Sequence, residues 1–267
     1  MMSNVCLRDN DVLISFQSIE NLTDVERQGH VGLELNAVHL WGIELDGSSR
    51  CLDRCMQWLD KEERQRAARF IREEDRQRYV LAHGGLRAVL SRYLGVAPDV
   101  LEMCRGEAGK PSLKREVRSQ PAIMFNMSHA QGRALIAVSK GQEVGIDLER
   151  IRPDVEAEKL SKRYFAPSEH ATMMQATQKQ RAGMFFRYWV SKEAVLKAQG
   201  IGLQALNQCE ILMTADGIGA EVLVPAGSRL QDSWRIRLLS CGEGWEAAVA
   251  AQELVRVAQC SFDRASY

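Results

Sequence analysis

The sequence predicts an α+β protein built from two similar halves. Three observations lead to this prediction. A strand-like run, in which apolar and polar residues alternate, is followed by a long region rich in helix-forming residues and then by further strand-like runs. A second helical region and a second group of strand-like runs continue the chain in the same order. Helices and strands grouped in this way are typical of an α+β architecture, and its simplest form packs the two halves side by side.

The N-terminal region supplies a weakly patterned segment and then the first strand. Residues 1–36 show little periodicity, so they are expected to form an N-terminal extension in which residues 12–16 could make a short strand. The predicted first half covers residues 37–145. Its first strand is the alternating run from Val38 to Leu45, which ends at the turn sequence of residues 46–49.

A helical region follows this strand. Residues 60–70 are rich in helix-forming side chains. The acidic residues 73–75 mark the start of another helix, because the helix dipole favours negative charge at this end. Apolar side chains recur along it at helical spacing, and Gly95 and Pro98 end it. These apolar side chains are Tyr79, Ala82, Leu86, Leu90 and Tyr93.

Three strand-like runs lie in the middle of the chain. Residues 123–127 predict one strand, and Ser128 and His129 place a hydroxyl and an imidazole just after it. Residues 134–138 and 144–148 are predicted to pair as a β-hairpin. The candidate metal-binding pair Asp147 and Glu149 would then lie on the second strand of this hairpin.

The second strand of this predicted hairpin carries two carboxylates at alternate positions. Alternation directs Asp147 and Glu149 to one face and Ile146 and Leu148 to the other. Two carboxylates at this spacing repel each other unless they face water or share a cation. The pair is therefore a candidate for one side of a metal site.

The second half, residues 146–255, repeats the order of helices and then strands. Residues 157–165 and 168–176 predict two short helices, and a long helix ends at Gly200, because glycine adopts the left-handed conformation of a helix C-terminus at low cost. Residues 256–267 are expected to form a tail. Four strand-like runs precede this tail, at 209–213, 220–224, 234–239 and 246–251.

The long helix presents two stripes of different chemistry. The apolar stripe comprises Val190, Ala194 and Ala198. The neighbouring stripe places Trp189, Glu193 and Lys197 in a row. Taken alone, this second stripe is equally typical of a partly buried tryptophan beside a solvated ion pair. Together with Asp147 and Glu149, however, Glu193 completes three oxygen ligands of the kind that Mg²⁺ prefers.

Four short motifs follow one another along the chain. They are Gly109-Lys110-Pro111, Phe125-Asn126-Met127-Ser128-His129, Val144-Gly145-Ile146-Asp147-Leu148-Glu149, and Trp189–Ala198 followed by Gly200-Ile201-Gly202-Leu203. In this order and at these spacings, they resemble the 4′-phosphopantetheinyl transferases of the surfactin-synthetase-activating, or Sfp-like, type. Each motif alone is weak, whereas the four together are specific. The resemblance covers residues 109–203 and extends more loosely over residues 38–250.

This resemblance implies a fold and an activity. In this family the two α+β halves form a pseudo-dimer with the active site in the groove between them. The enzyme moves 4′-phosphopantetheine from coenzyme A to a serine of an acyl- or peptidyl-carrier protein and releases adenosine 3′,5′-bisphosphate. Coenzyme A and an apo-carrier protein are therefore the expected substrates, and the nucleophile belongs to the carrier protein.

The resemblance also implies roles for the candidate residues. Asp147, Glu149 and Glu193 are expected to bind Mg²⁺, for which Mn²⁺ could substitute. Asp147, Glu193 and Lys197 are the expected catalytic residues; Glu193 could also accept the serine proton, and Lys197 would neutralise charge on the pyrophosphate. Lys192 is either a solvated neighbour or a phosphate contact. Contacts to coenzyme A are expected from Arg66, Lys110, Ser128, His129, Asp147 and Lys197.

Three of these assignments have simpler alternatives in the sequence pattern itself. Arg66 could belong to a solvated helix face, because two further arginines lie close to it in the sequence. Lys110 could be an ordinary surface lysine in a turn, and His129 could be a packed, hydrogen-bonded histidine. The resemblance favours cofactor contacts for all three.

Composition argues against several other classes of protein. Lysine plus arginine equals aspartate plus glutamate, 35 of each, whereas nucleic-acid-binding proteins usually carry a basic excess. The seven cysteines follow no zinc-binding spacing, and the sequence shows no secretory signal, which favours a reducing compartment. No run approaches the roughly 18 apolar residues of a membrane span. We therefore expect a cytoplasmic monomer that binds neither nucleic acid nor membranes.

Two alternative functions are also considered. One is another magnesium-dependent nucleotide enzyme, such as a pyrophosphatase, but no water-activating set of residues is evident in the sequence. The other is a non-catalytic module that binds coenzyme A or a carrier protein. Loss of an acidic residue from the proposed metal site would favour this module, and all three are present. Release of adenosine bisphosphate would distinguish the transferase from both.

Overall fold

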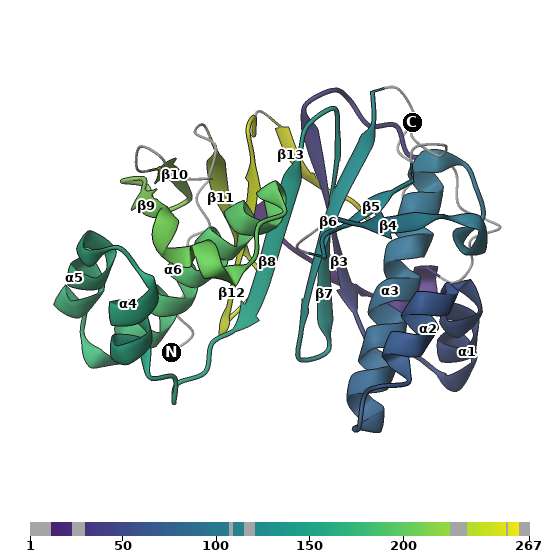
Figure 1. The fold of residues 1–267 in the computed structure, drawn as a ribbon, viewed down its shortest axis with the longest axis horizontal. Coiled ribbons are helices and arrows are strands. Elements are labelled where there is room, and N and C mark those ends of the chain that lie inside the picture. The colour runs from purple at the N-terminus through teal and green to yellow at the C-terminus, as the bar shows by residue number, and fades with distance from the viewer. Residues whose placement is uncertain are drawn as a thin grey trace, which may run out of the picture.

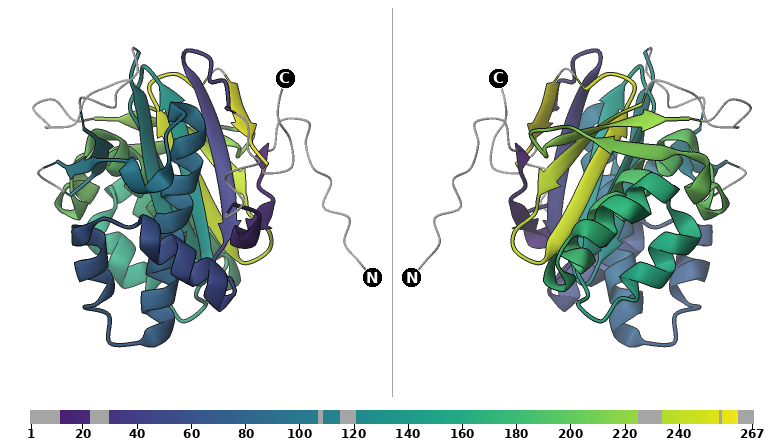
Figure 2. Two further views of the ribbon diagram at one scale, coloured as in Figure 1. Left: turned by 90° about the vertical axis from the view of Figure 1, so that its right-hand side faces the viewer. Right: turned by 90° about the vertical axis from the view of Figure 1, so that its left-hand side faces the viewer.

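The computed structural model describes residues 12–22, 30–106, 109–114, 121–224, 234–254 and 256–261. Within these ranges the chain forms two α+β halves that lie side by side, which confirms the predicted fold class (Figure 1). Each half is a β-sheet with helices on its outer face, as the two side views in Figure 2 show. Among the described helices, none combines the length and the apolar character needed to cross a membrane.

The first half follows the predicted order, with one strand, then helices, then further strands. Helix α2 begins with a capping box, in which Asp60 and Glu63 each bond the other's backbone N–H. Helix α3 ends at Gly95, whose φ of 66° is left-handed, as the sequence predicts. The elements are β3 (Ala37–Glu44), α1 (Ser49–Trp58), α2 (Lys61–Ala67), α3 (Glu73–Leu94), β4 (Met103–Arg105), β5 (Pro111–Leu113), β6 (Ile123–Ala130) and β7 (Arg133–Lys140).

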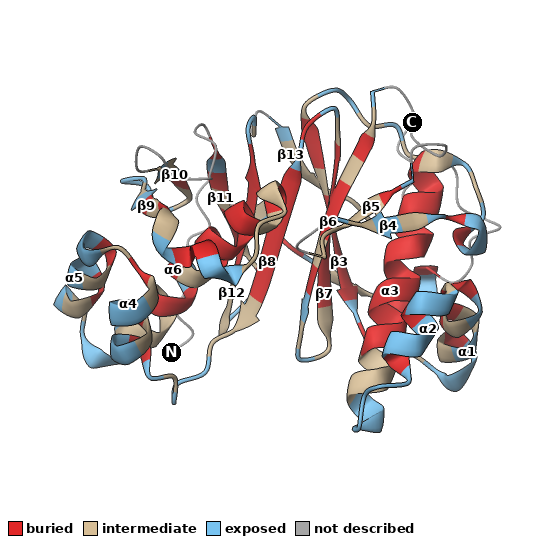
Figure 3. Cartoon of the chain, viewed as in Figure 1, coloured by how far each residue is buried: buried red, intermediate tan, exposed pale blue. Residues whose placement is uncertain are grey.

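The second half is organised around helix α6. This helix begins at Gln178, after a capping box formed by Thr177 and Gln180, and it ends at the left-handed Gly200. Most of its C-terminal part is buried against β8 and β12, as the red segment in Figure 3 shows. The elements are β8 (Val144–Arg150), α4 (Ala157–Tyr164), α5 (Pro167–Gln175), α6 (Gln178–Gln199), β9 (Glu210–Met213), β10 (Gly219–Leu223), β11 (Arg235–Ser240) and β12 (Trp245–Ala251).

The two sheets face each other through a shared apolar layer. Val38 and Leu40 of β3 contribute to it from the first sheet, and Ile146 and Leu148 of β8 contribute from the second. Alternation along β8 therefore directs Ile146 and Leu148 to this layer and Asp147 to the opposite face, beside α6, as predicted. Separate apolar clusters pack α1 to α3 on one sheet and α4 to α6 on the other.

The predicted hairpin between residues 134–138 and 144–148 is wrong. Strand β7 pairs with β6 and β3, whereas β8 pairs with β12 in the other sheet. The hairpin of the first half is instead β6–β7, which turns at Gln131 and Gly132, two residues with positive φ. The segment between β7 and β8 therefore crosses from one sheet to the other. Periodicity identifies strands but not their partners, which are chosen by long-range packing.

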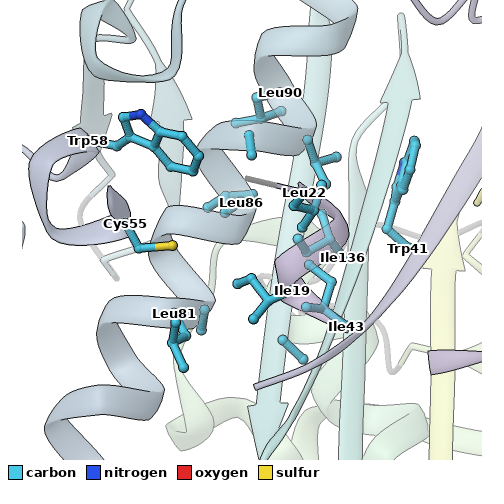
Figure 4. Close-up of a cluster of buried hydrophobic side chains, with 14 of the residues drawn as sticks. Ile19, Leu22, Trp41, Ile43, Cys55, Trp58, Leu81, Leu86, Leu90 and Ile136 are labelled. Carbon is cyan, nitrogen blue, oxygen red and sulfur yellow. The ribbon is translucent and has the colours of Figure 1, made fainter. Parts of the chain in front are cut away.

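The two ends of the described chain add strands to the core. Strand β1 (Val12–Leu13) pairs with β11 of the second half, and β2 (Phe16–Ser18) pairs with β3 of the first half. Strand β13 (Arg256–Gln259), from the predicted tail, also pairs with β3. Ile19 and Leu22 of the 3₁₀ helix η1 (Ile19–Leu22) are fully buried against α3 (Figure 4).

The expectation that residues 1–36 and 256–267 stand apart from the core is therefore wrong for two segments. Strands β1, β2 and β13 are integral to the sheets, and η1 packs in the core. The possible strand at residues 12–16 includes β1, whereas strands as short as β2 and β13 carry too little periodicity to be recognised in full from sequence. Residues 1–11, 23–29 and 262–267 of the same predictions lie outside the described residues.

Candidate functional site

Three of the predicted site residues meet at the junction of the two halves. Ser128 lies on β6, Asp147 on β8 and Lys197 on α6. Lys197 Nζ donates to Asp147 Oδ1 at 2.6 Å and to Ser128 Oγ at 3.1 Å, and Ser128 Oγ donates to the same Asp147 oxygen at 2.9 Å. Asp147 is only 3% exposed. Residues that are far apart in the sequence thus form one buried polar cluster, called the junction cluster below.

Two further carboxylates act on the junction cluster through their charge. Burial, together with the negative charges of Asp147 and Glu149, raises the pKa of Glu193 to about 7, and Lys197 only partly opposes this rise. Burial and the charge of Asp147 also raise the pKa of Glu149. The site therefore concentrates more negative charge than Lys197 neutralises.

The chemistry of these groups suits a bound divalent cation. Asp147 Oδ2 is buried and has no hydrogen-bond partner, so one ligand oxygen is free. A cation would also relieve the repulsion that raises the pKa of Glu193. Within the described ranges, no three Asp, Glu, His or Cys side chains stand close enough together to form a ready-made metal site. In this structure, the nearest positive charge to Asp147 is the ammonium group of Lys197.

Gly145 allows β8 and α6 to approach closely enough to form this cluster. A Cβ atom at residue 145 would lie 2.0 Å from the carbonyl oxygen of Ala194 and 2.4 Å from the backbone nitrogen of Ala198. Both distances are far below van der Waals contact, so only glycine fits between this strand and this helix. The close approach places Asp147 within reach of Lys197.

His129 lies inside strand β6, which runs to Ala130, and not after the strand as predicted. The residue as a whole is exposed, although neighbouring groups surround its imidazole ring. Desolvation by the surrounding groups, together with the positive charges of His83 and Lys197, lowers the pKa of His129 to about 4. The imidazole is therefore neutral at pH 7 in the absence of an anion.

Lys110 does not join the junction cluster. Its Nζ donates to Glu143 Oε2 at 2.6 Å, to Ala198 O at 2.7 Å and to Val144 O at 3.2 Å. The lysine also lines a cavity of about 240 Å³ between the halves, to which Phe125 and Gly200 contribute. These three bonds use all the donor hydrogens of the ammonium group, so the expected phosphate contact is not supported by its arrangement.

Arg66 is exposed on α2 and acts on a different group. Burial and the charge of Glu63 raise the pKa of Tyr79, while the positive charges of Arg105 and Arg66 partly offset that rise. The buried hydroxyl of Tyr79 has no hydrogen-bond partner. The predicted contact of Arg66 with coenzyme A stays a prediction.

Lys192 matches neither of its predicted alternatives. It is fully buried and pairs with Glu169 at 2.9 Å, and it donates to the carbonyl oxygens of Leu206 and Cys209. Glu169 in turn accepts bonds from the backbone nitrogens of Ala166 and Ile211. This lysine ties α6 to α5 and to the start of β9, so it is a structural residue.

Sequence reasoning assigned no role to two residues beside the site. Asn126 Oδ1 accepts a bond from the backbone nitrogen of Ile146 at 2.9 Å and so joins β6 of the first sheet to β8 of the second. Glu246 is paired across the sheet with Glu149 and is bound by Arg187. Asn126 could have been noticed as a polar residue inside an apolar strand, whereas Glu246 carries no comparable signal.

Two family models match the chain and divide it at the point where it crosses between the sheets. The model described as "4'-phosphopantetheinyl transferase, N-terminal" matches residues 46–141. The model described as "4'-phosphopantetheinyl transferase superfamily" matches residues 143–250. The second match contains Asp147, Glu149, Glu193 and Lys197.

Three curated proteins with related names are similar to the chain. The 4'-phosphopantetheinyl transferase HetI of Nostoc sp. is 37% identical over 213 residues, which cover 78% of this chain and 90% of that protein. The 4'-phosphopantetheinyl transferase Sfp of Bacillus subtilis is 29% identical over 67% of this chain and 78% of its own length. AcpT of Escherichia coli, another protein of this name, is 36% identical over 43% of this chain and 55% of its own length.

Proposed function

Because the chain belongs to the 4′-phosphopantetheinyl transferase superfamily, we propose that the junction cluster of Ser128, Asp147 and Lys197 is its active site. The protein is an enzyme that transfers 4′-phosphopantetheine from coenzyme A to carrier proteins. The observation that carries the assignment of the site is the 2.6 Å ion pair between Lys197 and Asp147, which unites motifs from two elements. Membership of this family favours transfer over a non-catalytic binding module or another nucleotide enzyme.

Positioning and charge neutralisation supply most of the proposed catalysis, as is usual for displacement at phosphorus. The side chain of Lys197 has an exposed fraction of 29%, so its ammonium group can meet the negative charge that grows on the pyrophosphate. Glu193, with a pKa of about 7, can accept the proton of the attacking serine near neutral pH. The serine belongs to the carrier protein, and adenosine 3′,5′-bisphosphate leaves.

Asp147, Glu149 and Glu193 are the residues that would hold Mg²⁺ or Mn²⁺. Their oxygen-only donor set matches the preference of these ions. When bound, such an ion would neutralise charge on the pyrophosphate oxygens. A carboxylate that binds a metal ion tightly is a weak base. Glu193 would therefore accept the serine proton directly only while its carboxylate does not bind the metal ion tightly.

The remaining site proposals concern coenzyme A and the cellular setting. Ser128, His129 and Arg66 stay proposed phosphate contacts, whereas Lys110 is reassigned below. The likeness to the Bacillus subtilis protein Sfp supports an Sfp-like subtype. We also retain the expectation of a cytoplasmic monomer that binds neither nucleic acid nor membranes.

The test is to incubate the protein with an apo-carrier protein, coenzyme A and Mg²⁺, and to follow the carrier by intact mass spectrometry. The expected product is a carrier enlarged by one phosphopantetheine, formed together with adenosine bisphosphate. A mass shift that vanishes when the acceptor serine is replaced by alanine would support transfer to that serine. An unchanged carrier with a panel of acyl- and peptidyl-carrier proteins would contradict the proposal.

A further inference from the structure

A single lysine of the first half contacts both second-half elements that carry the proposed active site. Lys110 binds Val144 O at the first residue of β8, and Asp147 lies three residues further along this strand. It binds Ala198 O in the last turn of α6, directly after Lys197. Lys110 therefore links the start of β8 to the end of α6. The Asp147–Lys197 ion pair joins the same strand and helix.

The bonding of Lys110 is complete within the protein. An ammonium group has three hydrogens, and three acceptors of the second half lie 2.6–3.2 Å from Lys110 Nζ. One of them is the carboxylate of Glu143. Ala198 O belongs to the C-terminal turn of α6, where helix carbonyls lack partners within the helix and a positive charge is favourable.

The loop that carries Lys110 is itself held in place. The Gly109 N–H donates to Gly106 O at 2.8 Å, and the Gly106 N–H donates to Lys110 O at 2.9 Å. Arg105 Nη1 donates to Gly109 O at 3.1 Å. Gly109 has a φ of +81°, which a residue with a side chain rarely adopts. The position of Lys110 is thus set before any ligand is present.

We propose that Lys110 is a positioning residue for phosphopantetheine transfer, which holds β8 and α6 in register so that Asp147, Glu193 and Lys197 keep their mutual geometry. This inference rests on the proposed active site. It replaces the expectation that Lys110 binds a phosphate of coenzyme A. A small misplacement of reacting groups can lower a rate by up to about a hundredfold, so a link of this kind affects turnover although it touches no substrate.

The two possible roles of Lys110 predict losses in different quantities, kcat for a positioning residue and coenzyme A affinity for a phosphate contact. If Lys110 is a positioning residue, Lys110→Met should lower kcat by about ten- to hundredfold and change the Kd for coenzyme A by less than about twofold. If it is a phosphate contact, the same substitution should weaken coenzyme A binding by about ten- to hundredfold, which is the value of a charged hydrogen bond.

The experiment measures kcat with a carrier protein and, separately, the Kd for coenzyme A by isothermal titration calorimetry. Lys114→Met is the matched control, because Lys114 is an exposed lysine that pairs with Glu102 within the first half. It should leave both quantities unchanged. Lys110→Arg keeps the charge but is too large and planar for the three acceptors, so it should also lower kcat without weakening binding.

Three outcomes would overturn the proposal. They are full kcat in Lys110→Met, a loss confined to coenzyme A affinity, or full recovery of kcat in Lys110→Arg. Thermal unfolding shows which variants are folded. If Lys110→Met is not folded, Lys110→Arg provides the decisive comparison. A wild-type protein that fails to modify any carrier would instead contradict the proposed function, so the two failures are distinguishable.

Discussion

At the scale of single residues, burial and neighbouring negative charge act together on the carboxyl group of Glu193. Glu193 is 9% exposed, and its carboxyl group lies near the carboxylates of Asp147 and Glu149, so its pKa rises to about 7. A glutamate with ordinary acidity would be a weak base at neutral pH, whereas this one is matched to proton transfer there. The same crowding of negative charge makes it a suitable neighbour for a divalent cation.

Glu193→Gln should abolish most of the activity and leave the fold intact. The amide keeps the shape of the side chain but removes both its charge and its basicity, so we expect a loss of about a hundredfold or more in the rate of carrier modification. Intact mass spectrometry measures the rate, and circular dichroism checks the fold. Glu221→Gln, an exposed change on β10, is the control. A near-wild-type rate for Glu193→Gln, or full activity of the wild type in excess chelator, would contradict the assignment.

His129 should distinguish coenzyme A from its 3′-dephospho form. The two compounds share the pyrophosphate and the pantetheine arm, so only a contact to the 3′-phosphate separates them. A charged hydrogen bond of about 1.5–3 kcal/mol corresponds to roughly ten- to hundredfold in kcat/KM. His129→Ala should therefore lower kcat/KM for coenzyme A and spare the dephospho form. Equal loss for both compounds would show that His129 serves another part of the site.

The protonation of His129 provides an independent test of this contact. Its pKa of about 4 leaves the free imidazole neutral, and a bound phosphate would favour the charged form and raise the pKa. An NMR titration of the imidazole should show a low pKa in the free protein and a higher one with coenzyme A. The depressed value also means that the contribution of His129 to stability is complete above pH 6.5 and is lost as the pH falls towards 4.

At the scale of secondary-structure elements, the contact between β8 and α6 decides the geometry of the proposed site. Gly145→Ala should push the two elements apart, because its methyl group would lie 2.0 Å from the Ala194 carbonyl oxygen. We expect destabilisation of about 1–3 kcal/mol, typical of overpacking, together with a loss of activity. Gly202→Ala is the control, since nothing lies within 4 Å of its added Cβ. Urea denaturation of both variants checks this, and an unchanged Gly145→Ala protein would contradict the role of the close approach.

The buried pair of Lys192 and Glu169 should stabilise the second half only when both partners are present. Lys192→Met leaves the Glu169 carboxylate buried without its cation, so we expect a loss of about 3–5 kcal/mol in the free energy of unfolding. Adding Glu169→Gln should recover part of that loss, because the amide carries no charge and its oxygen can still accept a backbone N–H bond. A double-mutant cycle by denaturant unfolding measures the coupling. Additive losses would show that the two side chains do not act as a pair.

Periodicity predicted most elements but not their pairing. The left-handed Gly95 and Gly200 end α3 and α6 as expected, because the signal for a helix end is local. Strand β8 was assigned to the wrong partner, since the strand pattern at residues 144–148 is the same whichever sheet receives it. Lys192 was misjudged for a similar reason: its burial depends on Glu169 and on backbone carbonyls that no local pattern reveals.

At the scale of the whole molecule, deletion of residues 1–36 should destabilise the protein, contrary to what the sequence indicates. The deletion would remove β1 and β2 from their sheets and the fully buried Ile19 and Leu22 from the core. Loss of a large buried side chain alone costs about 2–5 kcal/mol. Thermal unfolding of the truncated protein should show a lower Tm or aggregation, and Ile19→Ala should show part of the effect. A truncated protein with unchanged Tm would contradict the packing of this segment.

The sequence motifs predict the residues of the proposed site better than they predict the strands and loops that support it. Ser128, Asp147 and Lys197 come together as the family resemblance implies, because the motifs preserve their chemistry at fixed positions. The sequence does not reveal that Lys110 bonds Glu143, Val144 O and Ala198 O, since a lysine in a turn can reach either a ligand or a carbonyl. Strand β1 falls within the possible strand at residues 12–16, whereas β13 has no counterpart in the sequence analysis, because four residues carry no measurable period.

The pairing of β13 with β3 has a consequence for the time at which the first half is completed during synthesis. Domains generally fold from the N-terminus as the chain leaves the ribosome. Here, however, the strand beside β3 is contributed by residues 256–259, which follow every strand of the second half in chain order. The part of β3 that pairs with β13, residues 37–40, therefore lacks this partner while the second half is being made, whereas residues 42–44 can already pair with β2. Until residue 259 has emerged, this short edge lacks its native partner, so the first sheet can be completed only after all strands of the second half have been synthesised.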